Sequence, residues 1–240
     1  MNHCWAVASL VMLTLMLIAP VAMAQTAPDV RDILRSVGET YGNAKQYRFA
    51  VAETGEDQGL IQIAVQKPNR FHFETDQQVP GGEDRFGPMT MVSDGNAVWN
   101  YASGLQQYTK KSTSLPLADT EPPDVTPETF VLQAETVFIT RYVRLATAVD
   151  HAKVLRQENF QNAECYVIEL QAPLPGFRDT YTWWVDKIRH VVLREDTQPD
   201  SPRRRPSRSV FSVARIDEPL PEELFHFTPP PGAKLVGQFE

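Results

Sequence analysis

The sequence predicts an α+β fold in which one antiparallel β-sheet is covered by two amphipathic helices. Three observations carry this prediction. Most of the chain from residue 47 onward alternates apolar and polar residues with a period of two, in short runs typical of strands. Tight turns rich in Gly, Asn and Asp separate several of these runs. Two other segments repeat their apolar residues every three or four positions, as helices do.

The N-terminal residues are typical of a secretory signal peptide. No charged residue occurs from Trp5 to Ala24, and Val7 to Ile18 is almost wholly apolar. Pro20 interrupts a helix, and Ala22-Met23-Ala24 is the small-x-small pattern that signal peptidase cleaves. We therefore expect residues 1–24 to be removed and the protein to reach the periplasm. An uncleaved anchor is the alternative, since about 20 apolar residues span a bilayer.

The charge and the cysteine content limit which binding partners and disulfides the sequence predicts. The net charge of −7 gives the chain no electrostatic reason to bind nucleic acid, and we expect no such partner. Removal of Cys4 leaves Cys165 alone, so no intramolecular disulfide is expected. Cys165 lies in a strand-like run, which favours a buried apolar role over a reactive thiol. We expect residues 25–240 to form a single, monomeric domain.

The first predicted helix covers Asp29 to Tyr41. Its apolar residues recur three or four positions apart, Pro28 precedes it, and Gly42-Asn43 is a plausible stop. Strands follow, and Asp94-Gly95-Asn96 forms one of the turns between them. The expected strands are residues 47–51, 59–65, 70–74, 91–93, 97–101, 106–110, 151–155, 165–171, 180–186, 190–196 and 210–216.

The second predicted helix interrupts the strands. Thr126 and Pro127 are a typical helix start. The apolar stripe consists of Phe130, Ala134, Val137, Phe138, Tyr142, Leu145 and Val149, and the opposing polar face of Gln133, Glu135, Arg141 and Arg144. Two polar inserts, near residues 114–127 and 197–209, are expected to be flexible.

The sequence offers no pattern of a catalytic or metal site. The histidines outside the signal are scattered without metal-ligand spacing: His72, His151, His190 and His226. Phosphate-binding and nucleophile-elbow motifs are also missing. We therefore expect a protein that is not an enzyme and holds neither metal nor cofactor. The basic run Arg203 to Arg205 with Arg208 is read as a solvated hairpin tip, with contact to an anionic surface as the alternative.

Several segments together resemble the LolA-like periplasmic lipoprotein carriers and their superfamily. The first is Val65-Gln-Lys-Pro-Asn-Arg-Phe71, similar to a basic-Pro-Asn-x-Phe motif at a strand end. The second is Val92-Ser-Asp-Gly-Asn-Ala-Val-Trp99, followed by Tyr101 and Gln107. The third is Leu224-Phe-His-Phe-Thr-Pro-Pro230 with Gly232, similar to the closing motif of the family. The resemblance spans most of residues 30–240.

This resemblance implies an incomplete, strongly curved antiparallel half-barrel with helices covering its concave face. It also implies an apolar cavity for the acyl chains of lipids or lipoproteins. The candidate cavity residues are Lys67, Phe71, Phe73, Trp99, Tyr101, Phe130, Phe138 and Tyr142. Each aromatic residue has an alternative role as ordinary core. Lys67 replaces the arginine characteristic of the family, so a point charge stands where a planar fork is usual.

Two functions remain open at this stage. The first is a lipid or lipoprotein binder that carries acyl chains toward the outer membrane. The alternative is a regulatory or interaction module of the same fold that senses envelope state through a membrane-protein partner. Relatives of the second kind usually have a further domain, and residues 25–240 leave little room for one, which favours the binder.

Overall fold

The computed structural model describes residues 28–55, 58–76, 84–112, 126–148, 151–171 and 178–239. The predicted signal peptide and nearly all of the insert at 114–127 lie outside the described residues. Among the described helices, none has the length and apolar character needed to cross a membrane.

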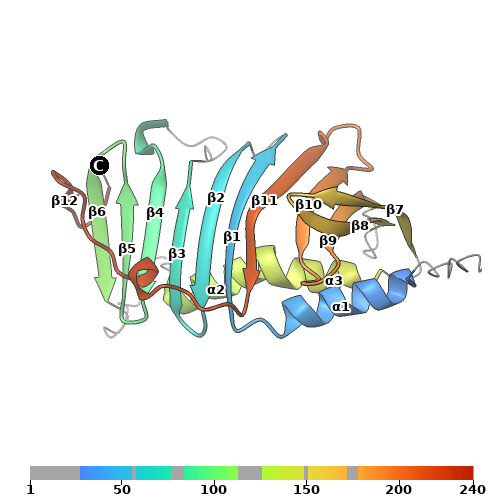
Figure 1. Ribbon diagram of the computed structural model, residues 1–240. Coiled ribbons are helices and arrows are strands. Elements are labelled where there is room, and N and C mark those ends of the chain that lie inside the picture. Colours follow the sequence, from blue (N-terminus) through green and yellow to red (C-terminus); the bar gives the residue numbers. More distant parts are fainter. Residues whose placement is uncertain are drawn as a thin grey trace, which may run out of the picture.

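Within these residues, twelve strands form one open sheet with the order β12-β6-β5-β4-β3-β2-β1-β11-β10-β9-β8-β7 (Figure 1). The strands are β1 Gln46–Thr54, β2 Gly59–Gln66, β3 Arg70–Thr75, β4 Met89–Asp94, β5 Ala97–Ala102, β6 Gln107–Ser112, β7 Ala152–Phe160, β8 Ala163–Gln171, β9 Thr180–Asp186, β10 Val192–Gln198, β11 Ser207–Ile216 and β12 Lys234–Leu235. Neighbours run antiparallel except β12, which lies parallel to β6. Each predicted run coincides with one strand, which confirms the predicted sheet.

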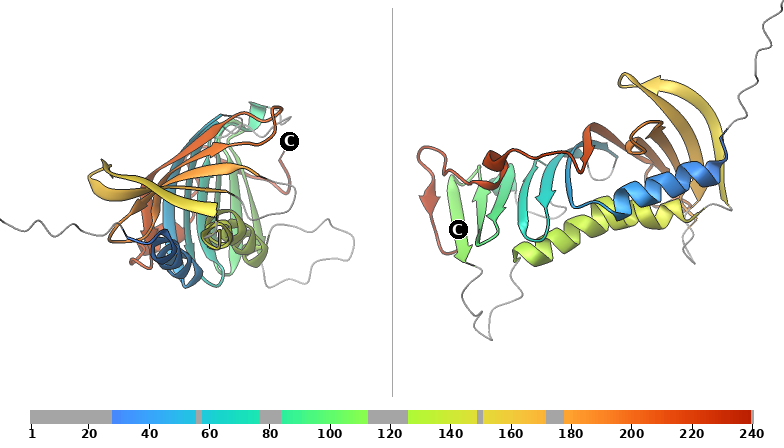
Figure 2. Two further views of the ribbon diagram at one scale, coloured as in Figure 1. Left: turned by 90° about the vertical axis from the view of Figure 1, so that its right-hand side faces the viewer. Right: turned by 60° about the horizontal axis from the view of Figure 1, so that its bottom comes forward.

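The helices lie on the concave side of this sheet, as predicted (Figure 2). Helix α1 covers Val30–Gly42, and Asp29 caps it by accepting a hydrogen bond from the Arg31 backbone N–H at 3.0 Å. Three consecutive helical elements form one continuous segment, which we call the covering helix: α2 Pro127–Glu135, the π-helical turn η2 Thr136–Thr140, and α3 Arg141–Ala146. Its capping box joins Thr126 and Thr129.

The π-helical turn changes which residues of the covering helix face the sheet. Val137, predicted in the apolar stripe, is 54% exposed, whereas Phe138 and Ile139 are buried. Each π-type hydrogen bond spans one residue more than an α-type bond, so the phase of the helix shifts at this point. The same shift explains why Arg141, which the sequence predicts on the polar face, points toward the sheet.

The C-terminal segment returns across the convex face of the sheet (Figure 1). Residues 217–239, which we call the strap, include the 3-10 turn η4 Glu222–Phe225 and end beside β6 with β12. A second short turn, η1 Asp84–Phe86, precedes β4. The strands β10 and β11 extend into the insert predicted at 197–209, where Thr197 pairs with Ser207, so the connecting turn covers only residues 199–206.

Candidate functional site

The interface between α2 and the sheet is built from phenylalanine rings. Phe130 of α2 stacks on Phe71 of β3 with ring centroids 4.0 Å apart, and its edge meets Phe73 at 5.5 Å. Phe71 and Phe73 share one face because they are two positions apart on β3. Phe71 is fully buried, while Phe73 and Phe130 are half-buried. The outer end of the covering helix therefore rests on an apolar surface that solvent partly reaches.

Deeper under the covering helix, aromatic rings fill the space against the sheet. Phe138 lies 5.9 Å from Phe49, and Tyr142 lies 4.8 Å from Tyr41 and 5.4 Å from Trp183. Burial, reinforced by the Glu195 carboxylate, holds the pKa of Tyr142 well above its usual value. Phe138 and Tyr142 are therefore core residues in this conformation.

An ion pair connects the covering helix to the sheet at the end of α2. Lys67 in the β2–β3 turn places its Nζ 2.5 Å from Oε1 of Glu135. The two side chains are 35% and 23% exposed, so solvent still screens this pair. Lys67 thus contacts the helix that covers the concave face.

Trp99 and Tyr101 lie on the opposite face from the other candidate residues. On β5 the helix-facing positions are Val98 and Asn100, which pair with Ser93 and Met91. Trp99 and Tyr101 instead surround Phe227 of the strap, at centroid distances of 6.2 and 6.4 Å. The structure therefore brings six of the eight predicted residues to the helix side and places these two under the strap.

A buried polar cluster escaped the sequence analysis. The Glu195 side chain is 2% exposed and accepts a hydrogen bond from Trp183 Nε1 at 2.8 Å. Arg141 of α3 forms an ion pair with the same carboxylate, and Thr197 Oγ1 lies 3.3 Å from it. No clear signal in the sequence marks Glu195 as buried, since it stands between the charged residues Arg194 and Asp196. A buried charge requires partners, and here they are Arg141 and Trp183.

Trp183 and Trp184 point to opposite faces, as their adjacency predicts. Trp183 faces the covering helix through Tyr142. Trp184 packs on the convex side, where the Arg194 guanidinium lies 4.0 Å from its ring. Only Trp183 can contribute to the concave surface.

The basic run near the β10–β11 turn is partly neutralised. Arg204 bonds Asp179 at 2.6 Å, and Arg208 bonds Asp196 at 2.8 Å. These contacts hold two of its arginines against the protein where β10 and β11 meet their connecting turn.

Cys165 packs inside the sheet, away from solvent. Cys165 is fully buried, and burial followed by the Asp186 charge raises the pKa of its thiol to about 11. It is therefore a protonated thiol that packs as an apolar side chain. Within the described ranges, no three His, Cys, Asp or Glu side chains are grouped to hold a metal ion.

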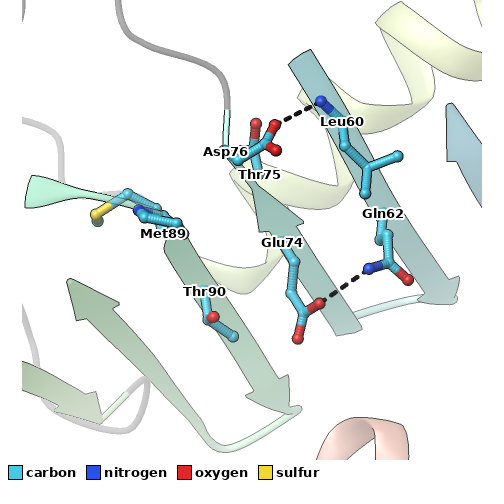
Figure 3. Close-up of a pocket in the computed structure, with 8 residues that line it drawn as sticks. Leu60, Gln62, Glu74, Thr75, Asp76, Met89 and Thr90 are labelled. Atoms are coloured by element: carbon cyan, nitrogen blue, oxygen red, sulfur yellow. Dashed lines mark hydrogen bonds between the residues drawn. The ribbon is translucent and has the colours of Figure 1, made fainter. Parts of the chain in front are cut away.

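A shallow pocket of about 260 Å³ lies over β2, β3 and β4 (Figure 3). Its lining is mixed. Leu60, Pro88 and Met89 lie beside polar groups, where Gln62 Nε2 donates to Glu74 at 3.2 Å and the Leu60 backbone N–H donates to Asp76 at 2.5 Å. Gln62 and Glu74 alternate with Ile63 and Phe73, so this pocket opens on the face away from the helices. It is therefore separate from the surface that the covering helix contacts.

These features define an open, curved sheet whose concave face is covered by an apolar helix surface. Comparison with known proteins assigns the family: residues 31–238 match the one described as "Predicted periplasmic protein (DUF2092)". The chain belongs to this family and is a periplasmic protein. It is 21% identical over 210 residues to an uncharacterized protein of Methanocaldococcus jannaschii, a match that covers 85% of this chain. The chain spans about half, 53%, of the length of that curated relative.

Solved structures share the fold. Lipoprotein LppX of Mycobacterium tuberculosis is 12% identical with a TM-score of 0.50, over 82% of this chain and 99% of that one. LprF of Mycobacterium bovis is 10% identical with a TM-score of 0.50, over 81% and 97%. A LolA superfamily protein of Nitrosomonas europaea also matches, at 15% identity over 84% and 99%, with a TM-score of 0.29 that adds no support of its own. The predicted fold, an open curved sheet covered by helices, is thus shared with LppX and LprF.

Proposed function

We propose that this protein binds the acyl chains of lipids or lipoproteins on its concave face, beneath the covering helix, and carries them through the periplasm toward the outer membrane. The observation that supports this most is the interface of α2 with the sheet. It is apolar on both sides and partly reached by solvent, and the ring contacts of Phe130 and the Lys67–Glu135 ion pair cross it.

The energetics favour such a ligand. An acyl chain of roughly 14 methylenes gains on the order of 11 kcal/mol when it leaves water. Phe71, Phe73 and Phe130 offer it an apolar surface once α2 moves outward. The screened ion pair between Lys67 and Glu135 opposes that movement by only about 0.5 kcal/mol.

The construction of the covering helix supports movement of α2 as a unit. Its own capping box satisfies the backbone N–H groups of Thr126 and Thr129 without help from the sheet. The π-helical turn at Thr136–Thr140 separates α2 from α3, and such turns are frequent at functional sites. We place the hinge there.

A matched pair of variants tests this proposal. Phe130→Ala removes the ring that holds α2 on Phe71, whereas Leu132→Ala truncates a side chain on the same helix that is 64% exposed. An apolar fluorescent probe is titrated into both proteins. We expect the affinity for the probe to change several-fold in Phe130→Ala and to stay unchanged in Leu132→Ala. Equal affinities in the two variants and the unmodified protein would argue against binding beneath α2.

A second candidate is an interaction module for a membrane-protein partner. Leu132 and Val137 on the outer side of the covering helix are 64% and 54% exposed, which suits contact with another protein. Leu132→Glu and Val137→Glu distinguish the two functions, since they would block such a partner and leave lipid binding intact. A purified protein that contains no lipid would favour this second candidate over the first.

A further inference from the structure

One buried hydroxyl on the helix-facing surface has no hydrogen-bond partner. Tyr47 of β1 is 1% exposed, and its Oη bonds to no atom among the residues that the structure describes. Tyr41, whose ring also neighbours Phe49, differs in this respect, because its Oη accepts a hydrogen bond from the Val192 backbone N–H at 3.0 Å. A buried polar group without a partner costs free energy, and buried polar groups of native proteins are nearly always paired.

Tyr47 belongs to the row of side chains beneath α2. It pairs with Val65 of β2, which pairs in turn with Phe71 of β3. Directly opposed residues point to the same face, and Phe71 contacts Phe130 of α2, so the Tyr47 side chain faces the covering helix. Two strand spacings, about 9.5 Å, separate Tyr47 from Phe71. Tyr47 is therefore a polar position within the apolar surface that is proposed to hold acyl chains.

The Lys67–Glu135 ion pair lies at the same end of the row. The Lys67 backbone N–H donates to the Lys45 carbonyl oxygen at 3.1 Å, so Lys67 lies across the β1–β2 pair, two positions along from Tyr47. Burial, followed by the Glu135 carboxylate, raises the pKa of Tyr47 above its usual value. The Tyr47 hydroxyl therefore keeps its proton and remains a hydrogen-bond donor.

The groups on the sheet at this point select an oxygen acceptor. When α2 moves outward, it carries Glu135 with it, and the sheet retains the hydroxyl of Tyr47 and the ammonium group of Lys67. Both groups donate hydrogen bonds, so an oxygen atom with partial or full negative charge satisfies them together. The carboxyl end of an acyl chain, as carboxylate or as ester, is such an acceptor. It is also joined directly to a hydrocarbon chain that suits Phe71 and Phe130.

We infer that Tyr47 Oη donates a hydrogen bond to the carbonyl oxygen of a bound acyl chain, at a subsite completed by the Lys67 ammonium group. This inference rests on the proposed function and gives its ligand a direction. The carboxyl end lies at Tyr47, near the Glu135 end of α2, and the chain runs beneath α2 toward Phe130. The bond supplies the partner that the hydroxyl lacks with α2 in place, so the subsite favours acyl carboxylates and esters over plain hydrocarbons.

Tyr47→Phe tests this inference because it removes the hydroxyl and keeps the ring. The full chain is titrated with the fluorescent probe N-phenylnaphthylamine, which has no carbonyl group, and the probe is then displaced by dodecanoic acid or by its methyl ester. Tyr47→Phe should weaken the binding of both acyl ligands about fivefold and leave the affinity for the probe unchanged. Tyr101→Phe, which removes a hydroxyl on the opposite face, should change none of the three affinities.

Thermal denaturation without ligand gives an independent check of the same variant. Tyr47→Phe should leave the stability unchanged or slightly raised, since an unpaired buried hydroxyl contributes nothing favourable to the fold. A clear loss of stability would mean that the hydroxyl already has a partner in the ligand-free protein, and this would overturn the inference.

Lys67→Gln separates the two acyl ligands. It removes the charge, so it should weaken the binding of dodecanoic acid more than that of the methyl ester. An unchanged ratio of the two affinities would exclude Lys67 from the subsite. Unchanged binding of both acyl ligands by Tyr47→Phe, or an equal loss for the probe, would overturn the subsite alone. An unmodified protein that binds neither the acyl ligands nor the probe would contradict the proposed function itself.

Discussion

Asp186 shows how single residues hold the turns of this sheet. Its carboxylate accepts backbone hydrogen bonds from Ile188 at 2.8 Å and Arg189 at 2.9 Å, and an ion pair from the Arg189 side chain at 2.8 Å. Burial alone would raise the pKa of this carboxyl group, but these donors outweigh burial and lower the pKa. The charged form of Asp186 is therefore favoured in the folded protein.

This lowered pKa gives a pH-dependent prediction. A carboxylate with a depressed pKa stabilises the fold above its unfolded pKa of about 3.9 and loses that contribution as the pH falls through the folded value. Asp186→Asn should thus lower the free energy of unfolding by about 1 kcal/mol at pH 7. The difference from the unmodified protein should shrink below about pH 4. Urea denaturation across pH checks this, and a constant difference would contradict it.

Periodicity in the sequence shows which side chains of a strand share a face of the sheet, but it does not show which face the helices cover. Trp99 and Tyr101 are two positions apart and therefore point the same way. Which face the covering helix occupies depends on contacts such as that of Phe130 with Phe71, which are far apart in the sequence and which periodicity does not contain. The charge cluster of Arg141 and Glu195 escaped prediction for the same reason, since 54 residues separate its members.

At the scale of elements, local patterns predicted most of the fold. Period-two runs located β1 to β11, and capping residues located the starts of α1 and of the covering helix. The two-residue strand β12 is too short to have a period. The prediction assumed an uninterrupted α-helix and therefore placed Val137 and Arg141 on the wrong faces of the covering helix. The π-helical turn that shifts them depends on packing against the sheet.

The contact between α1 and α3 gives a stability prediction. Gly38 lies inside α1, and a methyl group at this position would lie 3.5 Å from Cβ of Ala146, an ordinary van der Waals distance. Gly38→Ala should raise the free energy of unfolding by about 0.5 to 1 kcal/mol, because the unfolded chain loses freedom and the helix loses none. Thermal denaturation measures this effect.

Gly42→Ala is the matched control for this prediction. Gly42 is the last residue of α1, where helix propensity counts for less, and its nearest neighbour would be Val143 at 3.8 Å. A smaller change is expected there. Destabilisation by Gly38→Ala would mean that α1 and α3 leave no room for a methyl group.

At the scale of the whole molecule, the strap fastens the convex face. Phe225 is fully buried and lies 4.5 Å beneath the Arg70 guanidinium, which also pairs with Glu222. His72 Nδ1 lies 2.9 Å from the backbone oxygen of Leu224. These contacts connect the C-terminal segment to β3, far from it in the sequence.

Truncation of the two strap phenylalanines should give unequal losses. Phe225→Ala removes a fully buried ring and should cost about 3 kcal/mol of unfolding free energy. Phe227 is half-buried among Trp99, Tyr101 and Tyr108, so Phe227→Ala should cost clearly less. Urea midpoints compare the two variants, and an unaffected Phe225→Ala protein would show that the strap does not stabilise the sheet.

The binding of acyl chains is the central claim at this scale. It is tested most directly by expressing the full chain in a periplasm, purifying it, and analysing an organic extract by mass spectrometry. The account predicts about one equivalent of phospholipid or of a lipoprotein acyl group per protein. A lipid-free protein that also fails to take up an apolar fluorescent probe would contradict it.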